Sequence, residues 1–193
     1  MKNLIVIFWC IFLLQSCKKE VSKQEDYMKI IQGKETNTTI IYKNGKLVSS
    51  EVFDKKQGYI DSKYVYKDGA VVKIYQYYPD KKVQSYSYLF KAPHNYTTTE
   101  YHKNGKVASE GEGDYYKANN LYLKRGEWIF YNKSGKPFSI YAFMHDGKKQ
   151  YVKSEILFDT ITGKIKKDTV FNPPFLLESG GFVPIKSSNS KNK

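Results

Sequence analysis

A short Asn-Gly-Lys motif recurs along this chain and restricts its fold more than any other feature of the sequence. Residues 42–51 and 101–110 match closely, since each begins on Tyr, contains Asn-Gly-Lys and ends on Ser-Glu. Less regular copies lie at residues 66–69, 78–83, 131–136, 144–148 and 158–164. Asn-Gly and Asp-Gly readily adopt the positive φ angles of a type I′ turn, which joins two antiparallel strands. The motif therefore predicts successive β-hairpins, with Gly45 and Gly105 at positive φ in type I′ turns.

The spacing of the motif agrees with a unit made of one strand and one turn. Gly45 and Gly69 lie 24 residues apart, Gly69 and Lys81 lie 12 apart, and Lys81 and Gly105 again lie 24 apart. A fixed internal period is typical of a repeat protein. A unit of about 12 residues, or a pair of about 24, has the length of a β-hairpin.

The residues between the turns alternate as β-strands do. In residues 83–90 the side chains of Gln84, Tyr86, Tyr88 and Phe90 fall on one face. Beyond the N-terminal segment no stretch has a convincing 3.6-residue apolar period, so helix should be scarce. The 18 tyrosines and 11 phenylalanines can cover a sheet about one layer thick. We therefore expect an all-β fold, an elongated open sheet of successive antiparallel β-hairpins, whose end strands need Lys and Pro for protection.

The N-terminus predicts export and a lipid anchor. Lys2 is followed by an apolar run over residues 4–14 and then by Leu-Gln-Ser-Cys at positions 14–17. At about 1.5 Å per residue the run reaches only about half of a 30 Å bilayer core, which suits a signal peptide and not a permanent span. The ending resembles a bacterial lipobox, in which Cys17 is lipidated and becomes the new N-terminus. An ordinary secretory signal is the alternative.

Four segments follow from these features. We expect a lipoprotein signal peptide over residues 1–16, a lipidated N-terminus and flexible tether over 17–37, hairpin repeats over 38–171, and an irregular cap with a disordered tail over 172–193. Mixed charges and few apolar residues predict the tether, and Pro and Gly predict the cap. One of the two cysteines leaves with the signal peptide and the other carries the lipid. Packing without disulfides must then hold the fold.

The residue after the lipidated cysteine indicates a location. In lipoproteins of Gram-negative bacteria an Asp at this position resembles an inner-membrane retention signal, whereas this chain has Lys18. Surface-exported lipoproteins of some groups carry acidic runs there, and Lys18 and Lys19 depart from that pattern. The expected location is the outer membrane, facing the periplasm, with surface exposure as the alternative.

The charge of the chain is strongly positive and almost wholly due to lysine. Lys and Arg total 32 against 19 Asp and Glu, a net charge of +13, and Arg125 is the single arginine. This composition counts against nucleic-acid recognition, in which bidentate arginine contacts to guanine are common. Lysines beside a membrane are attracted to anionic headgroups by roughly 1 kcal/mol each. An acidic partner or surface is therefore expected, and a solvated lysine-rich face without a partner is the alternative.

Residues 101–131 carry a more specific pattern. Asn-Gly-Lys lies at 104–106, Ser-Glu-Gly at 109–111, and Gly-Glu-Trp at 126–128, followed by an aromatic pair. This stretch resembles the MORN-repeat variant of proteins often labelled YwqK-type antitoxins. The resemblance implies successive antiparallel hairpins that act as a binding or scaffolding module. Between Gly111 and Gly126 the chain departs from the family by an insertion, which we interpret as a longer hairpin loop.

The sequence predicts no catalytic residues, no metal site and no cofactor. Its three histidines fall in different repeats without the spacing of metal ligands, and they are interpreted as ordinary surface residues. Glu110, Glu112 and Asp114 could hold a hard cation such as Ca²⁺, but Glu110 and the glycine after it already belong to the repeat. No phosphate-binding loop or nucleophile elbow is present. We therefore expect a protein that is not an enzyme.

Two functions remain open. In the first, a membrane-anchored lipoprotein uses its hairpin repeats to bind or scaffold an envelope protein or an anionic surface. In the second, an antitoxin or immunity protein neutralises a toxin by direct binding. Lys103, Lys106, Lys133 and Lys136 flank the best-formed turns and are the predicted contacts. Trp128 is interpreted first as a core or stacking residue of the repeat, and it is the predicted contact if aromatic packing mediates recognition instead.

Overall fold

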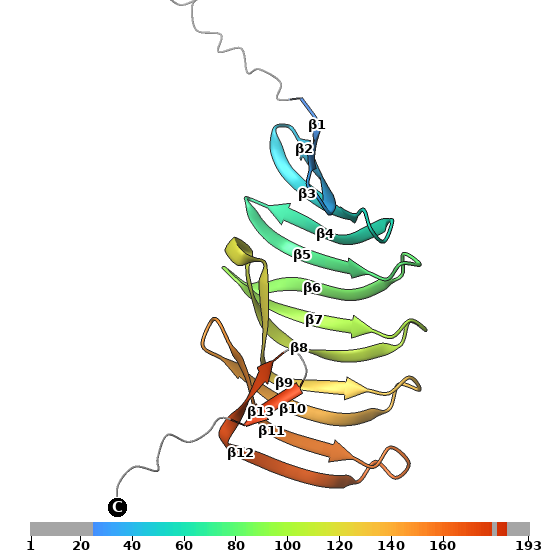
Figure 1. Cartoon of the computed structure of the whole chain (residues 1–193), viewed down its shortest axis with the longest axis vertical. Helices are drawn as coiled ribbons and strands as arrows, with labels where there is room; N and C mark the ends of the chain where they lie inside the picture. Colours follow the sequence, from blue (N-terminus) through green and yellow to red (C-terminus); the bar gives the residue numbers. More distant parts are fainter. Residues whose placement is uncertain (1–24, 179–180, 185–193) are drawn as a thin grey trace, which may run out of the picture.

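The computed structural model describes residues 25–178 and 181–184. These residues form one 13-stranded sheet in which each strand pairs with its neighbours in sequence, as Figure 1 shows. Every pairing is antiparallel, and the only helix within these residues is the three-residue 3₁₀ turn η1 (Lys117–Asn119). The predicted all-β sheet of successive hairpins is confirmed. In the described part of the chain, no helix is long and apolar enough to cross a membrane.

The strands follow one another without a crossover. Their bounds are β1 (Tyr27–Gln32), β2 (Thr36–Lys43), β3 (Lys46–Asp54), β4 (Tyr59–Lys67), β5 (Ala70–Tyr77), β6 (Val83–Lys91), β7 (Asn95–Tyr101), β8 (Val107–Tyr116), β9 (Leu121–Tyr131), β10 (Pro137–His145), β11 (Gln150–Phe158), β12 (Ile165–Glu178) and β13 (Gly181–Pro184). Since each connection reverses the chain, the connections after β1, β3, β5, β7, β9 and β11 share one long side of the sheet. We call it the first rim; it lies on the right of Figure 1. Two strands and two turns return the chain to the same rim, which explains the 24-residue spacing.

The turns confirm positive φ at the motif glycines and correct one turn type. Asn44 and Gly45 have φ of 49° and 68°, as a type I′ turn requires. At Gly105 φ is 82°, but Asn104 is not at positive φ, and Gly105 N–H donates to the carbonyl of His102. This is the pattern of a three-residue loop, a type I turn followed by a bulge, so type I′ is wrong at Gly105. The copy at 101–110 has one more residue between its tyrosine and Asn-Gly than the copy at 42–51 has. The longer loop accommodates this extra residue.

The predicted tether is too long at its C-terminal end. Residues 27–32 form β1, which pairs with β2 from Tyr27 opposite Tyr42 to Gln32 opposite Asn37. The rings of Tyr27 and Tyr42 stack with 4.4 Å between their centroids. Aromatic and β-branched residues in this segment favour a strand, and they outweigh the polar residues around them.

The predicted irregular cap is regular β-structure where it is described. The chain continues in β12 as far as Glu178 and then forms β13. Pro173 and Pro174 fall where the pairing of β12 with β11 is interrupted, between Val170 and Phe175. Proline is compatible with a strand at such an irregularity, because no ladder hydrogen bond is lost there.

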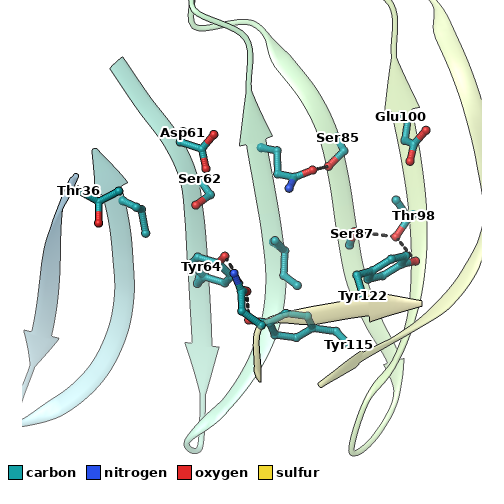
Figure 2. Close-up of a pocket in the computed structure, with 14 residues that line it drawn as sticks. Thr36, Asp61, Ser62, Tyr64, Ser85, Ser87, Thr98, Glu100, Tyr115 and Tyr122 are labelled. Carbon is teal, nitrogen blue, oxygen red and sulfur yellow. Dashed lines mark hydrogen bonds between the residues drawn. The ribbon is translucent and has the colours of Figure 1, made fainter. Parts of the chain in front are cut away.

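The hairpin of β8 and β9 supplies the cover that a one-layer sheet lacks. Both strands are long, and the tip of the hairpin folds back over β4 to β7, on the side that we call the inner face (Figures 1 and 2). Tyr115, near the tip, packs on Val71, Ile74 and Tyr96 in one buried cluster. The insertion predicted as a longer hairpin loop is therefore a folded element that shields the sheet from water.

A second buried cluster lies under the C-terminal strands. Trp128, Phe143 and Val152 form its centre, and Leu177 from the end of β12 packs against it. Trp128 is 0% exposed, and its indole N–H donates to the carbonyl of Glu112 at 2.7 Å. A Cβ atom at Gly111 would lie 2.5 Å from the Trp128 ring. The glycine of the Ser-Glu-Gly motif thus leaves room for the tryptophan of the next strand.

Candidate functional site

Three consecutive connections of the first rim gather positive charge. They span residues 78–82, 102–106 and 132–136 and contain six exposed lysines and one carboxylate. The lysines, which we call the lysine cluster, are Lys81, Lys82, Lys103, Lys106, Lys133 and Lys136. The carboxylate belongs to Asp80, whose pKa is lowered chiefly by the hydrogen bond from the backbone N–H of Lys82. Asp80 therefore stays ionised, and it neutralises only one of the six cations, lying 3.3 Å from Lys82 Nζ.

Hydrogen bonds from turn to turn fix the relative positions of the three connections. Lys82 Nζ donates to the carbonyl of Lys103 at 3.3 Å. Asn104 Nδ2 donates to the carbonyl of Lys133 at 2.9 Å, and Lys106 Nζ donates to the carbonyl of Ser134 at 2.8 Å. Side chains of one turn thus satisfy backbone carbonyls of the next, and the cluster has a defined backbone frame.

The structure brings the four predicted lysines together. Lys103 and Lys106 lie on one turn and Lys133 and Lys136 on the next turn of the same rim, and all four are exposed. Lys81 and Lys82 extend the group by one turn, and the sequence indicated them only through the degenerate copy at residues 78–83. Cys17, the predicted site of lipidation, lies outside the described residues.

The prediction of Trp128 as a binding residue is wrong. Its side chain is completely buried against Phe143 and Val152, and Lys124 Nζ lies 3.7 Å from the ring centroid. A side chain in this position cannot reach a partner while the sheet is folded. Trp128 therefore belongs to the core of the repeat.

A groove lies on the inner face beneath the tip of the β8–β9 hairpin (Figure 2). It has a volume of about 460 Å³. We call it the inner groove; its polar walls come from β4 to β7 and its roof from Tyr115, Asn120 and Tyr122. Small polar residues are buried along these strands, among them Ser85, Ser87 and Thr98. Sequence reasoning missed the groove, although serines spaced two residues apart were a visible signal.

A β-bulge directs one carboxylate toward the inner groove. Val52 of β3 pairs with Ser62, and Phe53 pairs with Ile60. Asp61 is therefore an extra residue of β4 that has no paired residue on β3. A bulge breaks the strict alternation of side chains and re-aims the inserted one. Asp61 and Ser62 consequently both line the groove, although they are adjacent in sequence (Figure 2).

Hydrogen bonds order the far wall and the roof of the groove. The hydroxyls of Ser87 and Thr98 lie 2.6 Å apart, and Thr98 Oγ1 lies 2.6 Å from the hydroxyl of Tyr122. Glu100 accepts from Lys124 Nζ at 3.0 Å. Burial raises the pKa of Tyr122, so this hydroxyl keeps its proton over the physiological range. The groove is thus held open by a connected polar frame.

The three neighbouring carboxylates of β8 are engaged separately and do not form a cation site. Glu110 accepts from the hydroxyl of Tyr131 at 2.6 Å, and Glu112 pairs with Arg125 at 2.8 Å. Asp114 is buried, and its Oδ2 lies 3.0 Å from His145 Nε2. His145 is therefore not the surface residue that the sequence indicated. Within the described residues no group of three or more His, Cys, Asp and Glu could hold a metal.

Comparison with known proteins assigns no family. No protein-family model matches the chain, and no curated protein does. Among solved structures, the chain is similar to a DUF3836-family protein from Parabacteroides distasonis, at 12% identity over 75% of this chain and 91% of that chain, with a TM-score of 0.14. It is also similar to a protein of unknown function from Bacteroides fragilis, at 16% identity over 77% and 93%, with a TM-score of 0.18. Neither TM-score is high enough to bear on fold or function, and the MORN-repeat resemblance stays a prediction.

Proposed function

We propose that this protein is a non-enzymatic, lipid-anchored module of the bacterial envelope that binds a negatively charged partner through the lysine cluster. The observation that carries the proposal is the gathering of six exposed lysines, with one carboxylate, on three turns tied together by hydrogen bonds. Clustered charge of one sign raises the local concentration of an oppositely charged partner and speeds its association.

The dimensions of the cluster favour an extended anionic surface over a small anion. Turns of one rim are two strands apart, which at about 4.8 Å per strand places them roughly 9.6 Å apart. Three turns then present a row of cations about 20 Å long. Neighbouring lysines repel one another along such a row, and a partner that meets all three turns relieves this repulsion. An acidic protein surface or an anionic membrane has the required length.

The proposed lipid on Cys17 would hold the first strands of the sheet close to the membrane. Ten residues lead from Cys17 to Tyr27, the first residue of β1. At no more than about 3.5 Å per residue, the sheet begins within about 35 Å of the anchor. We expect Cys17→Ala to move the protein out of the membrane fraction, as fractionation and immunoblotting would measure. Retention of this variant in membranes after a high-salt wash would contradict the anchor.

Two binding assays test the proposed partner chemistry. The lipidated chain serves as bait in a pull-down from solubilised envelopes, and the chain without lipid is co-sedimented with vesicles. Vesicles of phosphatidylglycerol and phosphatidylethanolamine are compared with vesicles of phosphatidylcholine alone. We expect an acidic protein or the anionic vesicles to bind, and binding to weaken as the Debye length falls from about 10 Å at 0.1 M salt to about 3 Å at 1 M.

The same assays can refute the proposal. Absence of both partners, or binding that is insensitive to salt, contradicts recognition by charge. Recovery of a toxin as the acidic partner assigns the cluster to an immunity protein and replaces the scaffolding role.

A further inference from the structure

The inner groove has a chemistry opposite to that of the lysine cluster. Its lining includes the carboxylates of Asp61 and Glu100 and, among the described residues, neither lysine nor arginine. An anionic ligand is therefore disfavoured in the groove, although the whole chain has a net charge of +13. The groove's volume of about 460 Å³ lies in the range of sites for small molecules.

Ser62 offers the inner groove a hydroxyl without a protein partner among the described residues. The residue is 4% exposed and lines the groove, and within the described chain its hydroxyl has no hydrogen-bond partner (Figure 2). Buried side-chain hydroxyls are nearly always paired with protein or with water. A hydroxyl that has no partner within the described chain and faces a groove is positioned to bond a molecule inside it.

The neighbours of Ser62 offer two more free groups to the same space. Gln76 pairs with Ser62 across the strands, and its Oε1 accepts from Ser85 at 2.8 Å. Gln76 is exposed, and its amide N–H groups, which have no partner within the described residues, are open to the groove and to solvent. Asp61, re-aimed by the bulge, adds a carboxylate without a partner in that part of the chain. A donor, an acceptor and a hydroxyl therefore converge on one side of the groove.

Two tyrosines supply an apolar surface next to these polar groups. The rings of Tyr64 and Tyr115 lie 6.3 Å apart between centroids, at an interplanar angle of 27°. Both hydroxyls donate to Asn120 Oδ1, at 3.4 and 3.0 Å. These bonds fix the rings with their polar tips together. Tyr115 is buried in the cluster described above, and the half-buried ring of Tyr64 is left as contact surface for an apolar patch on a ligand.

We propose that the inner groove binds an uncharged saccharide, whose hydroxyls bond Asp61, Ser62 and Gln76 and whose ring packs against Tyr64. Each sugar hydroxyl both donates and accepts a hydrogen bond, so adjacent hydroxyls satisfy a carboxylate, an amide and a serine at once. An amine could satisfy the carboxylate but has no acceptor for the amide of Gln76. The site is separate from the lysine cluster and does not depend on the function proposed for it.

Ligand titration of the chain without lipid tests this site. The probes are glucose, galactose, N-acetylglucosamine and maltose, with glucose 6-phosphate and spermidine as charged comparisons, in calorimetry and in NMR titrations. We expect a neutral sugar to bind and to shift the backbone amide signals of β4 and β5. Asp61→Asn and Ser62→Ala should each weaken binding by about tenfold, because the first replaces a charge-assisted hydrogen bond by a neutral one and the second leaves a bonded sugar hydroxyl unpaired. Asp68→Asn, an exposed carboxylate change on a turn outside the groove, should leave it unchanged.

The controls separate this site from the lysine cluster. Reversal of Lys103, Lys106, Lys133 and Lys136 to Glu should leave sugar binding intact. No binding by any neutral sugar at millimolar concentration, or equal binding by the Asp61 and Ser62 variants, overturns the proposal. Spermidine binding that is lost in Asp61→Asn also overturns it, because the groove is then an amine site.

Discussion

The lysine cluster and the inner groove are both polar surfaces of one sheet, but the fold controls them to different degrees. In the cluster the backbone is fixed by tight turns and by bonds such as that from Asn104 to the carbonyl of Lys133, while the lysine side chains are exposed. In the groove the side chains themselves are fixed, by the bulge at Asp61 and by the returning hairpin.

This difference shows that, in a thin sheet, the rim recognises a partner by charge and the inner face recognises a ligand by shape. The rim can collect charge of one sign because each turn projects into solvent, where lysine is easily accommodated. The inner face can be shaped only where the chain folds back over it. The positive net charge of the protein therefore agrees with the charge of the rim and differs from the charge of the groove lining.

The largest expected effect tests the buried cluster under the C-terminal strands. Trp128→Ala removes a fully buried indole and its bond to Glu112, so the free energy of unfolding should fall by about 3–5 kcal/mol. Urea unfolding followed by circular dichroism measures this. Phe138→Ala, at a residue 38% exposed, is the matched control and should cost much less. Equal losses in the two variants would contradict the role of Trp128 in stabilising the fold.

An intermediate effect is expected from the turn that carries part of the cluster. Gly105 has φ of 82° with no atom within 4 Å of an added Cβ, so Gly105→Val is penalised through the backbone and not through a clash. A β-branched residue at positive φ should lower the free energy of unfolding by about 1–2 kcal/mol. Ser134→Ala on the neighbouring turn should change it by less than about 0.5 kcal/mol. An unchanged urea midpoint for Gly105→Val would refute the turn assignment.

The smallest effect concerns alkaline pH and the cluster of side chains beneath the groove. Burial raises the pKa of Tyr96 to about 12, against about 10 in an unfolded chain. The fold therefore favours the neutral phenol, and the stability that this adds is complete below about pH 10 and is lost as the pH rises toward 12. Tyr96→Phe should flatten the decline of the urea midpoint over this interval. A decline as steep as in the parent protein would place the alkaline sensitivity elsewhere.

The fold could be predicted from the sequence because its determinants are local. Asn44-Gly45 sets its turn by backbone preference alone, and the alternating aromatics set the strands on either side. The three-residue loop at Gly105 was misassigned as type I′, since both turn types place a glycine at positive φ. The strand at Tyr27–Gln32 was missed because its partner, β2, is what makes that segment ordered.

The site could be predicted only where it depends on sequence spacing. Lys103 and Lys133 share a rim because two strands separate their turns. The 24-residue period indicates this only in part, since 30 residues separate the two lysines and the insertion in the β8–β9 hairpin accounts for the excess. The burial of Trp128 depends on contacts with later strands, through Phe143, Val152 and Leu177. The groove depends on a hairpin that folds back over strands far away in sequence. The register shift that frees Asp61 is likewise invisible without the paired strand.

The central claim is that the position of the lysines on the rim, and not the net charge of the chain, selects an anionic partner. Two variants of equal charge test it: Lys103, Lys106, Lys133 and Lys136 changed to Glu, and the exposed lysines Lys43, Lys46, Lys148 and Lys149, which flank or lie in turns of the other rim, changed to Glu. Binding to phosphatidylglycerol vesicles or to the recovered acidic partner is measured at one salt concentration, with urea unfolding as the check that both variants fold. At roughly 0.5 kcal/mol or more for each exposed contact, the first variant should bind at least about thirty-fold more weakly, and the second should bind nearly as the parent does. Equal losses in the two variants would contradict the claim and would leave the lysines as a general solvated charge.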